Sequence, residues 1–277
     1  MFFPFHDDNP TRRTPVVTYA LVGLNVAAFL WASQLPPPKQ QSLVLNRGFI
    51  PARIAQLSDP KPLAIKEPVL VRHRFFGVVQ QQRQVAVLQP NPPAIFLSLL
   101  TCMFLHANWA HILGNMWFLW LFGNNVEDRL GGALYLLFYL GGGILASGFH
   151  WMHDPTSTAP VIGASGAVAA ILGGYAITWP WSRVHCLLFL FIFITIIDVP
   201  ALLVLGTWFL FQVLEARKAL GLGIDGGVAF WAHIGGFLVG LILMPLLSAL
   251  VGAEPTKPPA PKPPQDDLFF PDDSQRQ

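Results

Sequence analysis

Charged residues are scarce in this chain of 277 residues: Asp, Glu, Lys and Arg make up 12%, against 53% for apolar residues. Soluble domains usually carry about 25% charged residues, so the composition excludes an ordinary soluble protein and indicates one that lies in a lipid bilayer. The net charge is only +2 and the basic residues are dispersed, so no nucleic-acid partner is expected. Two cysteines are too few for a disulfide framework.

Five long stretches contain no Asp, Glu, Lys or Arg at all. Because a hydrocarbon core about 30 Å thick needs about 20 apolar residues per helix, such stretches predict membrane-spanning helices. A sixth apolar region, residues 184–214, is interrupted by Asp198 and Pro200. The five uninterrupted stretches are 14–38, 84–126, 130–153, 155–182 and 226–253.

We therefore expect an all-α polytopic membrane protein with a bundle of six transmembrane helices. Residues 1–14 would form a cytosolic N-terminal tail, residues 15–250 the membrane domain, and the Pro- and Asp-rich residues 251–277 a disordered tail. The first apolar run, 15–33, is too long for a signal peptide and is interpreted as an uncleaved anchor. The expected spans are 15–33, 112–122, 133–152, 165–179, 201–219 and 229–250.

A long polar segment, residues 35–93, separates the first span from the next and is expected to lie outside the membrane. Within it, the runs Val69–Phe76 and Val85–Leu88 predict a small β-hairpin. The apolar run 94–105 is short, so we expect it to lie in the membrane interface beside the true span at 112–122.

Polar side chains inside the spans are few, and each is a functional candidate because burying it in hydrocarbon is costly. They are Ser165, His233, and the pair His111 and Asn115, which are four apart and so share one helix face. Ser165 and His233 also begin rows of small residues, which let two membrane helices approach closely. We expect that approach to bring the serine hydroxyl within about 3 Å of the imidazole, as a nucleophile and its general base require.

Taken singly, these residues have simpler interpretations. A serine among glycines usually serves helix packing, and a lone histidine at a helix end is usually interfacial or bonded to backbone. Gly163-Ala164-Ser165-Gly166 also differs from the Gly-x-Ser-x-Gly motif of soluble hydrolases, because residue 167 is Ala. The coincidence of polar groups near the start of three separate spans favours a catalytic site.

Together these motifs resemble the rhomboid family of intramembrane serine proteases over about residues 94–250. By this resemblance Ser165 is the nucleophile and His233 the general base of a dyad, while the Ser165 amide, His111 and Asn115 form the oxyanion site. The resemblance also implies transmembrane protein substrates and no metal or cofactor. Ala169 replaces an aromatic residue that stacks on the base in some members, so the group that orients His233 is open. The matching pieces are His111-x-x-x-Asn115, Glu127-x-Arg129, Gly163-x-Ser165-Gly166 and Ala232-His233-x-Gly235-Gly236-x-x-x-Gly240.

The three site-bearing spans can place their polar groups together only if all of them begin on one membrane face. Residues 180–228 must then cross the bilayer once, so Ala201–Ala219 is the expected span. Phe191–Ile197 would be a membrane-dipping or extended connection buried against protein. The glycine-rich segment Gly221–Gly227 is interpreted as a mobile cap over the site.

The predicted function is an intramembrane serine endopeptidase that acts on transmembrane protein substrates. The alternatives are a non-catalytic binder of membrane-protein clients, and a transporter, which the lack of an acidic pair at mid-depth disfavours. The sequence contains no His-Glu-x-x-His motif, so a metalloprotease has no support. The expected location is a bacterial plasma membrane, crossed several times, with both termini in the cytosol.

Overall fold

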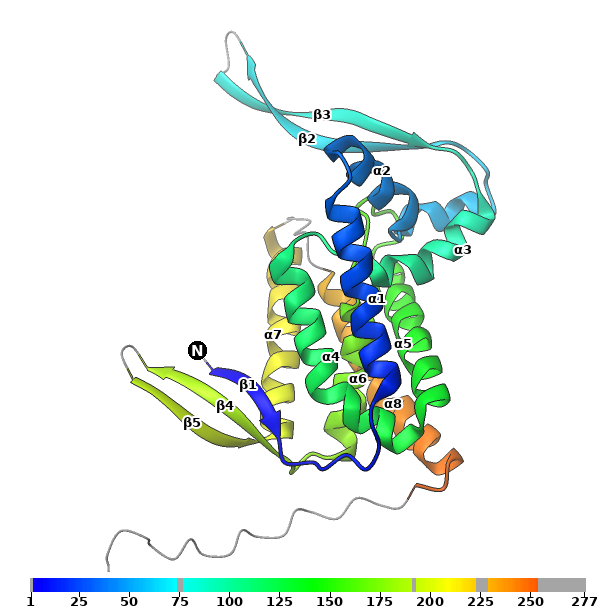
Figure 1. Ribbon diagram of the computed structural model, residues 1–277. Helices are drawn as coiled ribbons and strands as arrows, with labels where there is room; N and C mark the ends of the chain where they lie inside the picture. Colours follow the sequence, from blue (N-terminus) through cyan, green and yellow to red (C-terminus); the bar gives the residue numbers. More distant parts are fainter. Residues whose placement is uncertain (1, 74–76, 191–192, 223–228, 254–277) are drawn as a thin grey trace, which may run out of the picture.

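The computed structural model describes residues 2–73, 77–190, 193–222 and 229–253. A bundle of helices forms the centre, and a small β-sheet lies beside each end of it (Figure 1). In chain order the elements are β1 (Phe2–Asp7), α1 (Val16–Ser33), α2 (Pro37–Arg47), η1 (Pro51–Leu57), β2 (Leu63–His73), β3 (Gly77–Leu88), α3 (Pro92–Thr101), η2 (Cys102–Phe104), α4 (Trp109–Leu130), α5 (Gly132–His153), α6 (Ser165–Thr178), β4 (Arg183–Leu190), β5 (Phe193–Pro200), α7 (Ala201–Leu222) and α8 (Phe230–Leu250).

The fold is mostly helical, but the prediction of an all-α protein is wrong. Within the described part of the chain, β1, β4 and β5 form one antiparallel sheet and β2 and β3 form a hairpin. The strands β4 and β5 are rich in β-branched and aromatic residues, which favour extended backbone. Apolar content alone cannot separate such a run from a membrane helix.

Three helices of the described chain are long and apolar enough to cross a membrane, namely α1, α5 and α8. The number rises to four if α3–η2 and α4, which meet at 83°, count as one bent span. This sharp bend confirms the predicted division of the apolar region after residue 93 into two short runs, and the interfacial position of the first run stays a prediction. Asn91 and Asn108 begin them, since their side chains accept hydrogen bonds from the amides of Ala94 and His111.

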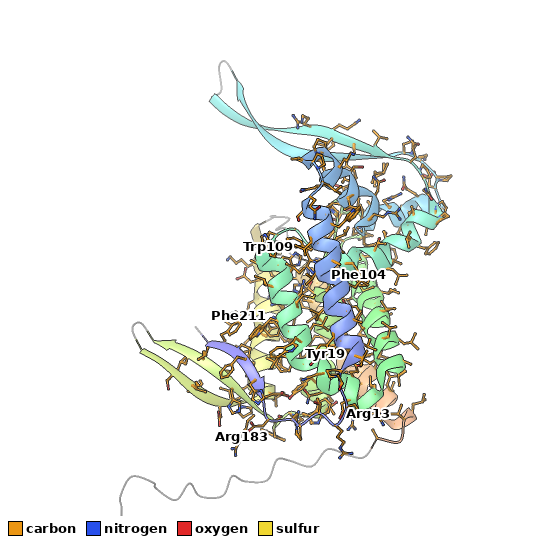
Figure 2. All side chains as sticks on the ribbon, viewed as in Figure 1. Arg13, Tyr19, Phe104, Trp109, Arg183 and Phe211 are labelled. Carbon is orange, nitrogen blue, oxygen red and sulfur yellow. The ribbon has the colours of Figure 1, made fainter. Side chains whose placement is uncertain are left out.

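The outer surface of the bundle is apolar, as a lipid-facing surface should be. Figure 2 shows the side chain of Phe211 directed away from the bundle, and Trp109 near the end where α2 lies. Arg13 and Arg183 lie at the opposite end, where the N-terminal segment enters α1. Large exposed apolar side chains occur on α1, α5, α7 and α8, including Leu24, Trp31, Leu137, Leu203, Phe211, Ile242 and Leu246.

The described part of the segment between α6 and α8 contains one long helix, as the crossing argument requires. Helix α7 begins at Ala201, the predicted first residue of that span. Residues 193–197 of the preceding segment are extended, as predicted, but they belong to a hairpin in which Thr195 and Ile196 are exposed rather than buried against protein. Residues 191–192 and most of the expected cap, 223–227, lie outside the described residues, as do 254–277 of the expected tail.

The first loop supports the connection that leads into α6. It contains α2, η1 and the β2–β3 hairpin, which confirms the predicted hairpin and extends it beyond the predicted runs. Phe49 and Val161 exchange two backbone hydrogen bonds of 3.0 and 2.7 Å, and the Ala52 amide donates to Ser157 O at 3.0 Å. These contacts hold residues 157–161, a few positions before Ser165, against the loop.

The N-terminal segment, expected as a cytosolic tail, is packed against the rest of the chain over residues 2–8. Strand β1 pairs with β4, and the indole Nε1 of Trp117 donates to Pro4 O at 2.8 Å. The buried carboxylate of Asp7 accepts a 2.5 Å hydrogen bond from the Tyr175 hydroxyl of α6. Burial raises the pKa of Asp7 to about 6, although the Tyr175 hydrogen bond lowers it. All these partners are more than 100 positions away, so no local pattern reveals them.

Glu127 fixes the beginning of α1 against the end of α4. Its carboxylate accepts from the amides of Val17 and Thr18 at 2.9 and 2.7 Å and from the Thr18 hydroxyl at 2.7 Å. These are first-turn amides that have no acceptor within the helix. A carboxylate there also interacts favourably with the positive end of the helix dipole. The matching arginine of Glu127-x-Arg129 donates from Nε to Ser248 Oγ at 2.8 Å, which ties α4 to the end of α8.

Glycines allow α6 and α8 to pack backbone against backbone. A Cβ on Gly240 would collide with the Ala170 carbonyl, one on Gly236 with the Gly166 carbonyl, and one on Gly173 with the Phe237 carbonyl. The small-residue rows predicted from the sequence therefore face each other. Nearly all of α6 from Ala167 to Ala176 is buried, so this short helix is the centre of the bundle.

We expect Gly240→Ala to destabilise the protein by about 2 kcal/mol or more, because the added methyl must push the α6 backbone away. Thermal unfolding in detergent micelles measures the effect. The matched control is Gly141→Ala in α5, where an added Cβ meets no atom within 4 Å. That variant should be neutral or stabilised by up to about 1 kcal/mol, because alanine favours helix. Equal destabilisation of the two variants would contradict the packing account.

Candidate active site

Ser165 is the first residue of α6 and follows a glycine in an unusual conformation. Gly163 has a φ of +117°, which L side chains rarely adopt, and its amide donates to Cys102 O at 2.9 Å. The chain thus turns sharply into the helix while remaining bonded to η2. The first amides of α6 have no acceptor within the helix, so this end can stabilise a developing negative charge.

The Ser165 hydroxyl contacts the imidazole that the sequence analysis pairs with it. Ser165 Oγ lies 2.7 Å from His233 Nε2, although the two residues are 68 positions apart. His233 is in the first turns of α8, next to the glycine contacts with α6. The predicted approach of the two residues is therefore present. A hydroxyl that donates to a neutral imidazole has a base ready to take its proton.

Gln212 on α7 makes the second contact of His233. Its Oε1 lies 2.8 Å from His233 Nδ1, while its Nε2 donates to Trp208 O at 3.5 Å. With Oε1 directed at the imidazole, Nδ1 must carry the proton, which leaves the Nε2 lone pair for the serine. Sequence reasoning missed this residue, although a lone amide within an apolar helix is a signal of the same kind that identified the other site residues.

Two aromatic rings, one from α7 and one from α8 itself, lie near His233. Trp208 of α7 lies 6.0 Å from the imidazole between ring centroids, and Phe230 of α8 lies 6.4 Å from it, edge-on at 89°. Ala169, at the position where some family members have a stacking aromatic, is fully buried in the α6–α8 contact. The His233 ring is therefore held by Gln212 and by aromatic side chains of α7 and α8. Gln212 is the group that orients His233, which the sequence alone does not identify.

His111 and Asn115 lie beside the turn that precedes Ser165. A Cβ built on Gly163 would lie 2.6 Å from His111 Nε2 and 3.5 Å from Asn115 Nδ2, so both nitrogens face this backbone. Asn115 Nδ2 is buried and lacks a hydrogen-bond partner among the described residues. Leaving such a donor unsatisfied costs about 1–3 kcal/mol. A buried donor without an acceptor suits a site that binds an oxyanion.

A small cavity adjoins the serine. Its size allows about one water molecule. It lies between the start of α6, α5 and the first residues of α8, and it combines polar and apolar surface. Its lining includes Cys102, Met103, Ser147, Gly163, Ser165 and Ala232.

Comparison with known proteins identifies the family of the chain. The sequence profile of the Rhomboid domain matches residues 94–250, which include every site residue named above. The chain belongs to the rhomboid family. It is similar to Rhomboid-like protein 11, chloroplastic, of Arabidopsis thaliana, with 35% identity over 180 residues that cover 60% of this chain and 57% of that protein.

Two further relatives extend the comparison. Rhomboid protein 1, mitochondrial, of Saccharomyces cerevisiae is 28% identical over 235 residues, 82% of this chain and 51% of that protein. Presenilin-associated rhomboid-like protein, mitochondrial, of Homo sapiens is 25% identical over 172 residues, 58% of this chain and 41% of that protein. This rhomboid-family chain thus spans about half the length of the curated relatives it matches.

The arrangement of Gln212 leads to a test of reactivity. We expect Gln212→Met to slow the labelling of Ser165 by a fluorophosphonate about 10- to 100-fold, because Nδ1 loses its acceptor and the imidazole is free to rotate or change tautomer. Gln212→Glu, which keeps an acceptor oxygen at the same distance, should retain more of the rate. The rate of gel-resolved labelling at fixed pH measures both variants, and equal slowing in the two would show that Gln212 acts only through packing.

Proposed function

We propose that this rhomboid-family protein is an intramembrane serine endopeptidase that hydrolyses peptide bonds in or near transmembrane segments of other membrane proteins. The observation that carries the proposal is a pair of linked hydrogen bonds. Ser165 Oγ lies 2.7 Å from His233 Nε2, and His233 Nδ1 lies 2.8 Å from Gln212 Oε1. These two hydrogen bonds connect a nucleophile, a general base and a group that orients the base. A protein that only binds clients has no need of them.

The chemistry follows from these contacts. The Ser165 hydroxyl attacks the substrate carbonyl while His233 Nε2 accepts its proton, and Gln212 Oε1 accepts the hydrogen bond of the other ring nitrogen throughout. The protonated imidazole then gives its proton to the leaving amine as the peptide bond breaks. Water attacks the resulting acyl-serine ester with His233 again as base, which releases the second product and restores the hydroxyl. No metal or cofactor takes part in these steps.

The negative charge that develops on the carbonyl oxygen requires donors that are already in place. Asn115 Nδ2, His111 and the amide of Ser165 are the proposed oxyanion site. The support is the position of both side chains beside Gly163 and the unsatisfied state of the Asn115 donor. In a site of low polarity one such donor is worth about 3–4 kcal/mol in the transition state.

We also propose six membrane spans, formed by α1, α4, α5, α6, α7 and α8. With one crossing each, the starts of α4, α6 and α8 lie on one face, which agrees with the contact between Ser165 and His233 and with the position of His111 beside Gly163. Both termini then lie on the other face together with the β1–β4–β5 sheet. Arg12, Arg13 and Arg183 fall on that side, as expected for a cytosolic face. A bacterial plasma membrane remains our proposal for the location.

Replacing the proposed nucleophile tests the function. In liposomes that contain purified protein and a model substrate with a helix-destabilised transmembrane segment, we expect Ser165→Ala to lower the cleavage rate at least 10³-fold, the order of loss found when a catalytic serine is removed. Fluorophosphonate labelling should disappear in the same variant.

The control is Ser98→Ala, because Ser98 is also buried but its hydroxyl donates within its own helix to Ile95 O at 2.7 Å. It should cleave at the wild-type rate. Cleavage retained by Ser165→Ala would overturn the mechanism. Wild-type protein that retains the substrate without cutting it would instead support the non-catalytic binder.

A further inference from the structure

A second group of chemically active side chains lies at the end of the bundle opposite Ser165. The His6–Asp8–His185 cluster consists of two residues from the N-terminal strand region and one from β4. One donor atom from each residue can be chosen so that all three lie within 4.8 Å of one another. Nothing in the proposed hydrolytic mechanism uses these residues, which belong to the sheet that joins the N-terminus to the α6–α7 connection.

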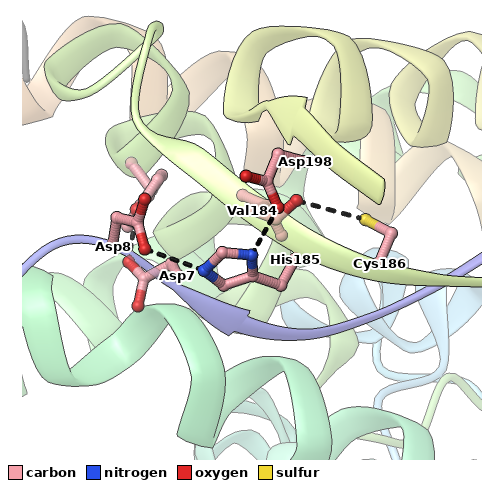
Figure 3. A network of polar contacts seen from close by, with 7 residues as sticks. Asp7, Asp8, Val184, His185, Cys186 and Asp198 are labelled. Carbon is pink, nitrogen blue, oxygen red and sulfur yellow. Dashed lines mark hydrogen bonds and ion pairs between the residues drawn. The ribbon is translucent and has the colours of Figure 1, made fainter. Parts of the chain in front are cut away.

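The histidine at the centre of the cluster is held on both sides. Asp8 Oδ1 lies 2.8 Å from His185 Nε2, and Asp198 Oδ1 of β5 lies 2.6 Å from His185 Nδ1 (Figure 3). The His6 ring is stacked on the His185 ring, with centroids 5.4 Å apart and planes 4° apart. The N-terminal segment and the β4–β5 hairpin, which are far apart in sequence, therefore meet at one imidazole.

Asp198 gives the cluster a feature that a chance meeting of polar surface groups lacks. A histidine that binds a metal usually donates its other ring N–H to a carboxylate, which fixes the tautomer and makes the coordinating nitrogen more basic. Asp198 occupies that position on Nδ1 and leaves Nε2 directed toward Asp8. The donor set is then two imidazoles and one carboxylate.

The charges also favour a cation. Asp8 and Asp198 both contact His185, so even a fully protonated imidazole offers one positive charge against two negative ones. A divalent ion between His185 Nε2, Asp8 and His6 would place two positive charges beside these two carboxylates.

We propose that the His6–Asp8–His185 cluster binds one divalent transition-metal ion of the zinc class, with water as a fourth ligand. Nitrogen and carboxylate donors in this number suit four-coordinate zinc, whose ligand atoms lie about 3.3 Å apart when the bonds are about 2.0–2.1 Å. His6 is exposed, so a change of its side-chain rotamer can bring it from its stacked position into the site.

The ion would clamp the N-terminal segment onto the β4–β5 hairpin. Asp7, between two of the ligands, already contacts Tyr175 of α6, so the clamp would act on the helix that begins with Ser165. This inference does not depend on the proposed protease activity. It concerns a structural ion that lies apart from the proposed hydrolytic centre. The sequence predicts no metal at that centre.

The test uses the full chain without a histidine tag, purified in detergent and freed of metal with EDTA. Titration with ZnCl₂ in a calorimeter should show one ion per chain, and Co²⁺ should give the visible absorption of a four-coordinate site. His6→Ala and Asp8→Asn should weaken the affinity about 100-fold or more. Asp198→Asn, which removes only the outer partner, should weaken it about 10- to 100-fold.

Two controls identify the site. His153→Ala removes an imidazole at the opposite end of the molecule and should leave zinc affinity unchanged, while His111→Ala tests whether the ion binds among the histidines near Ser165 instead. Zinc should also raise the unfolding temperature of the wild type but not of His6→Ala, which replaces an exposed side chain and is expected to fold. Fewer than one ion per chain, unchanged affinity in His6→Ala, or loss of binding in His111→Ala alone would overturn the proposal.

Discussion

The close approach of α6 and α8 is the constraint on which the candidate site depends. Their backbones touch through Gly166, Gly173, Gly236 and Gly240, and at this distance the first turns of the two helices put a hydroxyl and an imidazole 2.7 Å apart. Neither helix gains a hydrophobic advantage over lipid by packing, so association must come from close fit and from polar contacts. The packing that stabilises the bundle is therefore the same packing that assembles Ser165 with His233.

The site extends beyond this pair through elements that are held independently. Helix α7 supplies Gln212, which fixes the tautomer of His233, and α4 supplies His111 and Asn115 beside Gly163. Helix α4 is itself fixed at its far end by Glu127 and Arg129, through contacts with α1 and α8. Movement of any one of these helices would displace the groups that it supplies while leaving the others in place, so the geometry of the candidate site depends on the packing of each helix.

The sequence alone predicts the parts that obey a local rule. Polar residues within apolar runs identify Ser165, His233, His111 and Asn115, and crossing parity places the start of α7 at Ala201. Two features are not predicted. Gln212 follows the same rule but lies in a run that reads as lipid-facing, and the strand at residues 2–7 depends on Trp117, Tyr175 and His185, whose proximity only the folded chain creates. Apolar β-branched runs such as β5 are also ambiguous, because length and hydropathy describe strands and helices alike.

The β1–β4 pairing has a consequence for how the chain is made. Residues 2–7 pair with residues about 180 positions later in the chain, and Asp8 contacts His185 across 177 positions. During synthesis the N-terminal strand must wait, with its backbone unpaired, until α1, α4, α5 and α6 have been inserted. Long-range pairings of this kind form slowly because loop closure precedes any stabilising contact. The sheet is thus a late step of folding, completed only after the helix that carries Ser165 is in place.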